Sequence, residues 1–398
     1  MLRLPTAGTP YRPAEVSRAI LGLFESKTVI QVFQEQLKKY LTVKNLALVN
    51  SGTTACYLLL EFFKKIRADS LRDEVILPAY TAPSLLLPIR AANLRPVLVD
   101  IDLQTFNLAI DQVSDAITSR TLAIMPVHMF GLPCEVEPLI RLTEAEDIFL
   151  FEDAASSLGT RLHGKMSGTV APFGFYSLNR GKNISTLAGG IITWRDTHYN
   201  EIMDKLVKAL SPVGFVAQKI ITLKIIGLSL AVKPLFYTLL TPLIAKYKYT
   251  TLHTHFESFA YTPTQAALGK ALWRSANVLT MRRIINGKIL LNIFGNRADF
   301  IVPLVKPEWE VAFNQFPLIV KDLSLRAEIQ RRLLAAGIET SLLYERPLHH
   351  IFPELNPTGS EPFPQATYLA EHLLLIPTHA QVRQSHLAII QDIIDSLC

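Results

Sequence analysis

The stretch IFLFEDAASS, residues 148–157, joins a short apolar run to the carboxylates of Glu152 and Asp153 and then to small residues. An apolar run of this length that ends in turn-forming residues is typical of a buried strand. Four runs upstream have the same form, namely LALVN (46–50), EVILP (74–78), RPVLVD (95–100) and LAIMPV (122–127). Helix-like stretches separate the five runs, among them 55–68 and 137–146. This alternation predicts an α/β fold whose mostly parallel sheet is covered by helices on both faces.

Ligands of such sheets gather at the carboxyl ends of the strands, so the polar residues that close each strand are the candidates for a site. Asp153 closes the fifth run, and the small residues after it leave room for a flat ligand. An aspartate in this place is suited to pair with the protonated pyridine nitrogen of pyridoxal 5′-phosphate (PLP), which preserves the ring's capacity to accept electrons. The alternative interpretation is an ordinary helix cap.

A second candidate is the turn Ser51-Gly52-Thr53, which lies between the first apolar run and a helix-like stretch. Free backbone N–H groups at the start of a helix, a hydroxyl and the helix dipole together attract an anion. The turn therefore predicts an anion site, with a plain N-cap as the alternative.

The third candidate is Lys182, which lies in a polar loop between two apolar strands, within FYSLNRGKN (175–183). A lysine in such a loop is usually a solvated surface residue. To form a Schiff base it needs a lowered pKa, which partial burial and a nearby cation such as Arg180 can supply.

In this order and spacing, the three motifs resemble those of the DegT/DnrJ/StrS family of PLP-dependent aminotransferases, over about Phe33 to Ile393. The family's serine stands five residues before its Schiff-base lysine and its Gly-Gly pair begins seven residues after it. Ser177, Lys182 and Gly189-Gly190 keep both intervals. Further matches are Glu152–Ala155, Pro78-Ala79-Tyr80-Thr81, Pro126-Val127-His128 with Gly131, Gln265-Ala266-Ala267, and Tyr344 with Pro347-Leu348-His349.

The resemblance implies PLP-dependent transferase fold type I, like aspartate aminotransferase, and a homodimer with its active sites at the interface. It implies that Lys182 forms the Schiff base and carries the proton, and that Asp153 holds the pyridine nitrogen. By the same resemblance the remaining cofactor-binding residues are Gly52, Thr53, Ser156 and Ser177. His128, a possible acid or base, is interpreted as a structural residue, because buried histidines usually pack and form hydrogen bonds.

Several positions depart from the family pattern. Ala82 stands where an aromatic residue usually stacks on the cofactor ring, and Ser156 replaces a glutamine. Ser258 and Ala260 replace an asparagine and an arginine in a loop that often reaches the cofactor phosphate of the partner subunit. We therefore expect the chemistry to be retained, while the usual nucleotide-sugar substrate is less secure.

The composition restricts the compartment and the partners. Cys56, Cys134 and Cys398 are odd in number and widely spaced, which fits a reducing compartment and offers neither a disulfide framework nor a zinc site. We predict no metal site and no export signal, and hence a cytoplasmic protein.

The net charge of +6 comes from one segment. Residues 205–256 carry seven lysines and no Asp, Glu or Arg, so the rest of the chain has 33 basic against 34 acidic residues. These lysines are embedded in Leu and Ile, which argues against a nucleic-acid partner. Lys233, Pro234 and Pro242 argue against a membrane span in the apolar stretch 225–245.

Two interpretations of this segment remain open. An interfacial segment on anionic lipid fits its basic and apolar composition, and it would place the protein peripherally on the inner face of a membrane. A buried helical hairpin whose lysines extend outward is the alternative.

We predict three parts: a large PLP-binding α/β domain with an N-terminal arm at 1–200, an apolar lysine-rich insertion at 201–260, and a connecting helix with a small α/β domain at 261–398. The expected reaction moves an amino group from an amino acid such as glutamate to a keto-sugar, nucleotide- or lipid-linked, in surface-glycan synthesis. One alternative is a PLP-dependent dehydratase, although the dehydratases of the family carry histidine in place of the lysine. The other is a membrane-associated binding or regulatory protein with decayed catalysis.

Overall fold

The structure is a computed structural model of the 398-residue chain, and it describes residues 2–8, 11–67, 71–233, 235–239, 254–356 and 359–397. Its centre is a seven-stranded sheet in the order β1-β9-β8-β5-β4-β2-β3. These strands are β1 Asn45–Val49, β2 Glu74–Pro78, β3 Arg95–Val99, β4 Thr121–Ile124, β5 Phe149–Asp153, β8 Phe173–Ser177 and β9 Gly190–Trp194. Only β9 runs against its neighbours β1 and β8. The predicted mostly parallel α/β sheet is confirmed.

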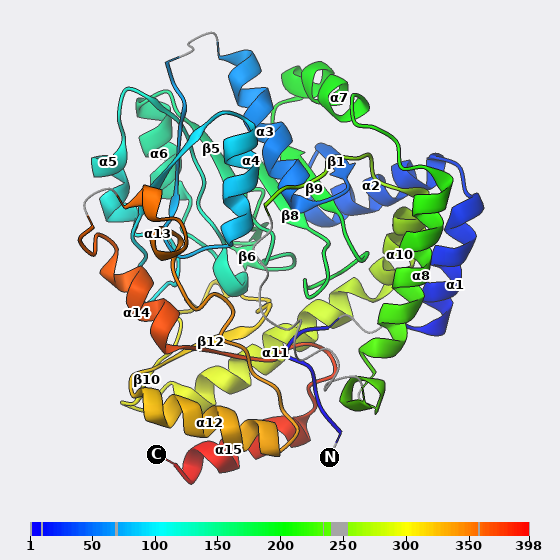
Figure 1. Cartoon of the computed structure of the whole chain (residues 1–398). Coiled ribbons are helices and arrows are strands. Elements are labelled where there is room, and N and C mark those ends of the chain that lie inside the picture. Colours follow the sequence, from blue (N-terminus) through cyan, green and yellow to red (C-terminus); the bar gives the residue numbers. More distant parts are fainter. Residues whose placement is uncertain are drawn as a thin grey trace.

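Each face of the sheet is buried by a different set of helices (Figure 1). Alternate residues of β1 divide between two apolar cores: Ala47 and Val49 pack in the core that contains α3, whereas Leu46 and Leu48 pack in the core that contains α2. This period of two is the ordinary consequence of strand geometry. The helices of this part are α1 Pro13–Leu21, α2 Thr28–Leu41, α3 Gly52–Ile66, α4 Leu86–Ala91, α5 Val113–Ala116, α6 Glu137–Ala145 and α10 Pro263–Leu272.

A smaller sheet lies in the C-terminal part of the chain, below the large sheet in Figure 1. Helix α11, Ala276–Phe294, leads from the large part to this sheet, which is antiparallel in the order β10-β12-β13. The elements here are β10 Phe300–Ile301, β12 Phe316–Val320, β13 Leu373–Ile376, α12 Leu323–Ala335, α13 Leu348–Ile351, α14 Pro364–His372 and α15 Gln384–Asp395. A third sheet joins β6 Arg161–Leu162 to β7 Lys165–Met166 and to β11 Trp309–Glu310. The domain limits predicted at residues 200 and 260 remain a prediction.

Much of the described part of the lysine-rich segment is helical, whereas residues 209–214, 232–233 and 254–256 are not. Helix α7 covers Asn200–Lys208, α8 covers Phe215–Ala231, and residues 235–239 are also helical. Helix α8 packs against α1 and α10 at the edge of the molecule (Figure 1). Among the described helices, none has both the length and the apolar character that a membrane span requires. Residues 234 and 240–253 of the predicted insertion lie outside the described part.

Gly190 allows the start of α3 to approach the sheet closely. A Cβ atom at Gly190 would lie 2.1 Å from the backbone oxygen of Ser51 and 2.9 Å from the backbone nitrogen of Gly52. Both neighbours are backbone atoms, so neither can turn aside. A glycine at the start of β9 is therefore required for Ser51 and Gly52 to lie beside the end of β8.

Substitution Gly190→Ala should lower the free energy of unfolding by roughly 1–3 kcal/mol or more, because the added methyl group has no room. Denaturant unfolding measures the change. Gly227→Ala is a suitable control, since no atom lies within 4 Å of its added Cβ and the position is inside α8. There alanine should stabilise by up to about 1 kcal/mol. Equal stability of wild type and Gly190→Ala would show that the close approach is wrong.

Candidate functional site

The three sequence motifs meet at one edge of the large sheet. Ser51, Asp153 and Ser177 close β1, β5 and β8 at the carboxyl ends of these mutually parallel strands. The loop that carries Lys182 follows β8 directly. The prediction that the motifs converge is therefore supported by the topology.

Lys182 points its amine into the site rather than into solvent. Its Nζ donates a hydrogen bond to Oγ of Ser156 at 2.8 Å. Burial lowers the pKa of Lys182 below 10.5, because removal from water disfavours the charged amine, while the Asp153 carboxylate acts in the opposite direction. Arg180, the cation expected to lower this pKa, does not contribute to the shift.

Asp153 is 4% exposed and closes β5. Burial raises the pKa of its carboxyl above 3.8, and the Ala155 N–H and the charge of Lys182 oppose the rise. One carboxylate oxygen, Oδ1, accepts the N–H of Ala155 at 2.8 Å. The hydrogen bond from Lys182 to Ser156, three residues after Asp153, brings the amine to the turn that follows this carboxylate.

The Gly-Thr turn begins α3 as expected. Ser51 is the N-cap residue, and its hydroxyl accepts the N–H of Thr54 at 3.0 Å. A Cβ atom on Gly52 would lie 3.1 Å from Cβ of Ser177 and 3.5 Å from its Oγ. The first N–H groups of a 15-residue helix thus lie beside a serine hydroxyl, which is the donor set that a phosphate group requires.

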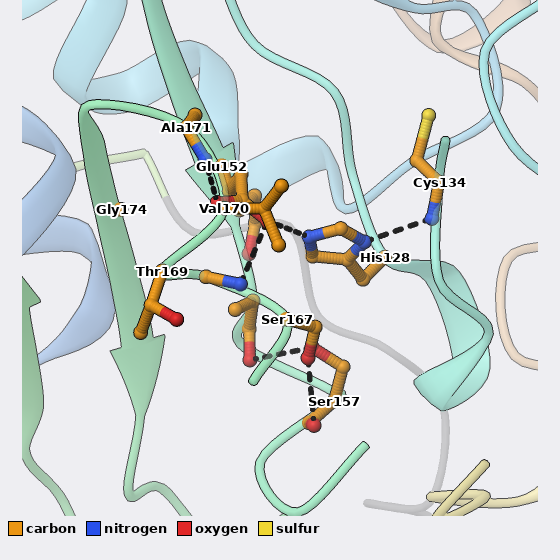
Figure 2. Close-up of polar contacts among 12 residues, drawn as sticks. His128, Cys134, Glu152, Ser157, Ser167, Thr169, Val170, Ala171 and Gly174 are labelled. Atoms are coloured by element: carbon orange, nitrogen blue, oxygen red, sulfur yellow. Dashed lines mark hydrogen bonds and ion pairs between the residues drawn. The ribbon is translucent and has the colours of Figure 1, made fainter. Parts of the chain in front are cut away.

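His128 is held by structural contacts (Figure 2). Its Nδ1 accepts the N–H of Cys134 at 2.9 Å, so Nε2 carries the proton and donates to Glu152 at 2.7 Å. The Glu152 carboxylate also accepts the N–H groups of Gly168 at 2.7 Å and Ala171 at 2.6 Å. Both ring nitrogens are therefore occupied in a fully buried network, in agreement with the structural role inferred for His128.

The hydrogen bonds of Asn314 and Asn183, called the polar clamp, hold the Lys182 loop and were not predicted from the sequence. Nδ2 of Asn314 donates to the carbonyl of Gly181 at 2.8 Å and lies 3.3 Å from Oδ1 of Asn183. Nδ2 of Asn183 in turn donates to the carbonyls of Leu158 at 2.8 Å and Ala312 at 3.0 Å. Residues on both sides of Lys182 are thus bonded to the segment that precedes β12.

The clamp rests on a buried cation, Arg283 of α11, which is 2% exposed. Its Nη1 donates to the carbonyls of Phe313 at 3.2 Å and Asn314 at 2.7 Å. Burial lowers the pKa of Arg283 to about 10. No sequence motif marks Asn314 or Arg283: Asn314 bonds to a loop 133 residues distant in the chain, and Arg283 acts on that loop only through Phe313 and Asn314.

Residues at or beside the departures from the family pattern have defined surroundings. The hydroxyl of Tyr80 donates to the carbonyl of Tyr344 at 3.1 Å, so Tyr80 is engaged with the C-terminal part of the chain. Thr81 is 2% exposed, and its hydroxyl has no hydrogen-bond partner within the described part of the molecule. Ser258 lies 3.5 Å from the hydroxyl of Thr54 in the same subunit.

The residues present fit PLP. Its phosphate matches the α3 N-terminus beside Ser177, its pyridine nitrogen matches a buried carboxylate, and its aldehyde matches an amine of lowered pKa. The buried hydroxyl of Thr81, which has no partner among the described residues, is a further polar group that a ligand could satisfy.

Comparison with known proteins agrees with this fit. The family model of the DegT/DnrJ/EryC1/StrS aminotransferase family matches residues 21–397. The chain is 31% identical, over 51% of its length and 53% of the relative, to GDP-4-keto-6-deoxy-D-mannose 3-dehydratase of Yersinia pseudotuberculosis. It is 35% identical to GDP-perosamine synthase of Caulobacter vibrioides, over 41% of its length and 43% of the relative. The aligned part spans about half the length of these two curated relatives.

Among solved structures, a putative sugar aminotransferase from Streptococcus pneumoniae, Spr1654, matches with a TM-score of 0.79 and 22% identity. The match covers 99% of this chain and 97% of that chain, which confirms the predicted fold type. The expectations of a PLP-dependent aminotransferase and of PLP as its cofactor are confirmed at the level of the family. By the match over residues 21–397, the chain belongs to the DegT/DnrJ/EryC1/StrS aminotransferase family.

Proposed function

We propose that this enzyme transfers an amino group from an amino acid, with glutamate the expected donor, to a keto-sugar in surface-glycan synthesis. The observation that carries the proposal is the placement of Lys182 and Asp153 at one strand edge: Asp153 closes β5, and Nζ of Lys182 donates to Ser156 in the turn that follows. A relative named GDP-perosamine synthase supports a nucleotide-linked sugar as the acceptor.

Each residue has a distinct part in this proposal. Lys182 would hold the cofactor through Nζ and would afterwards accept and return the substrate proton, a task that suits an amine of lowered pKa. Asp153 would hold the proton on the pyridine nitrogen. Gly52, Thr53 and Ser177 would bind the phosphate. When bound, PLP supplies the electron sink that stabilises negative charge on the carbon beside the amino group.

Ser156 would orient the Lys182 amine, because its Oγ is the acceptor at 2.8 Å from Nζ. The same hydroxyl, placed beside the point of cofactor attachment, would be a short partner for the cofactor's ring hydroxyl. This second part is the role that the family resemblance implied for Ser156.

A dehydratase is the second candidate, since one relative is named as a 3-dehydratase. Lys182 argues against it, because the dehydratases of this family carry histidine in that place. Incubation of the purified enzyme with glutamate and GDP-4-keto-6-deoxy-D-mannose separates the candidates: an amino sugar supports the proposal, and a deoxygenated keto-sugar supports the dehydratase. If neither product forms and the purified protein contains less than one PLP per subunit, a binding protein that has lost its catalytic activity is supported.

We also propose a homodimer, and a peripheral contact of the lysine-rich segment with the inner face of a membrane. The dimer is supported by the family resemblance and by an exposed apolar stripe on α11, formed by Val278, Met281 and Ile285 at 61%, 53% and 44% exposure. The membrane contact is supported by the exposed apolar side chains of α8.

Lys182→Ala should abolish amino transfer, because the cofactor loses the amine proposed to hold it. Borohydride reduction followed by peptide mass analysis should find PLP on the Lys182 peptide of the wild type. Asp153→Asn should still attach PLP but lose most activity, since an unprotonated pyridine is a poor electron sink. Lys165→Ala is the control, as this exposed lysine lies on β7. Near-normal turnover by either site variant would refute the roles.

The pH at which PLP attaches should reflect the lowered pKa of Lys182. Only the neutral amine reacts, so attachment to the PLP-free protein should reach half its maximal rate below pH 10.5, the ordinary lysine value. The Asp153 charge opposes the lowering, so Asp153→Asn should move this midpoint to still lower pH. Borohydride trapping at a series of pH values measures it. A midpoint at the ordinary value would contradict burial of the amine.

Asn314→Ala should weaken the hold on the Lys182 loop. We expect a loss of kcat on the order of tenfold to a hundredfold from misplacement of the amine, with faster loss of PLP and little change in KM. Asn107→Ala is the matched control, because Asn107 is also a buried amide, 2% exposed, and bonds to Met129 and Leu132 instead. If both variants lose stability alike and neither loses PLP, Asn314 has no positioning role.

A further inference from the structure

Helix α8 exposes one continuous apolar stripe. Val216, Ile220, Leu223 and Leu230 are 71%, 47%, 67% and 44% exposed. Their spacing of four, three and seven residues places all four on one side of an α-helix, with Gly227 between the last two. At 1.5 Å per residue the stripe is about 20 Å long.

The opposite side of α8 is the side that packs on the protein. Thr222, Ile225 and Ser229 are 4%, 0% and 8% exposed, and α8 contacts α1 and α10. The orientation of the helix is therefore fixed by burial of a partly polar side, while the more apolar side faces outward. This arrangement is the reverse of an ordinary surface helix.

The apolar surface continues beyond α8. Leu235, Phe236 and Leu239 are 57%, 42% and 66% exposed, and together with Phe215 at 49% they bring the exposed large apolar residues of 215–239 to eight. Exposed large apolar side chains gathered in one segment of this kind are typical of an interaction site.

Positive charge borders the stripe on both sides. On a helical projection Lys219 and Lys224 fall on opposite edges of the row formed by Val216, Ile220 and Leu223. Both lysines are exposed. The chain has no acidic residue from 205 to 256, so no carboxylate of this segment neutralises them.

We propose that the α8 stripe is the lipid-binding face of the protein, with α8 parallel to the surface of an anionic bilayer. The proposal rests on the membrane contact proposed above and names its geometry: the four apolar side chains enter the boundary between headgroups and acyl chains. Lys219 and Lys224 lie level with the anionic headgroups on either side. An apolar protein partner would leave both lysines without counter-charges, so charge complementarity favours an anionic bilayer over a second copy of this basic segment.

Flotation of the full-length PLP-loaded enzyme with vesicles tests this arrangement. We expect binding to phosphatidylcholine vesicles that contain phosphatidylglycerol, weakened but not abolished by salt, because screening acts on the lysines alone. Lys219→Gln with Lys224→Gln should reduce affinity for the anionic vesicles by roughly fivefold per lysine, the equivalent of about 1 kcal/mol each. The same pair should change binding to neutral vesicles little.

Leu223→Glu should abolish flotation on both kinds of vesicle while PLP attachment and amino transfer in solution stay unchanged. Leu334→Glu is the matched control, since Leu334 of α12 is 43% exposed and lies outside the stripe. No flotation of the wild type, or equal loss in both variants, would overturn the proposal. If Leu223→Glu alone changes the oligomeric mass, the stripe binds a second copy of the chain and the proposal is overturned. Absence of amino transfer by the wild type counts against the proposed reaction and not against the lipid-binding face.

Discussion

Burial of the Lys182 amine next to the buried Asp153 carboxylate is the constraint on which the site depends. Each group alone is costly to remove from water, and burial shifts the pKa of each toward its neutral form. Each charge in turn favours the charged form of the other. Burial and mutual attraction therefore oppose each other in setting both pKa values, a balance that suits an amine that must hold a cofactor and carry a proton.

Such a balance requires a rigid backbone around Lys182 and Asp153, because movement would separate the two groups or let water reach them. Three separate networks meet this requirement. Glu152 and His128 form a fully bonded core beside β5, Ser51 and Gly190 hold the start of α3 against β9, and Asn314 bonds the loop that carries Lys182. The last of these joins the large sheet to the C-terminal part, so the position of the amine depends on contacts from both.

The sequence was sufficient for the sheet and for the residues at its edge, because apolar runs separated by helices allow few arrangements. Asp153 and the Gly52 turn could be located since parallel strands bring their carboxyl ends to one edge, and Ser177 was located by the family resemblance. The hydrogen bond between Lys182 and Ser156 could not be predicted, as side-chain direction in a loop is not encoded by spacing. Asn314 and Arg283 were missed for the same reason at longer range. For α8, composition indicated an apolar basic segment, but only packing on α1 determined which side stays exposed.

A crystal structure of the PLP-loaded enzyme tests the central claim most directly. The account predicts continuous density from Nζ of Lys182 to the cofactor, the Asp153 carboxylate at the pyridine nitrogen, and the phosphate between the first turn of α3 and Ser177. Density for a cofactor that is not joined to Lys182, or whose pyridine nitrogen faces away from Asp153, would contradict it.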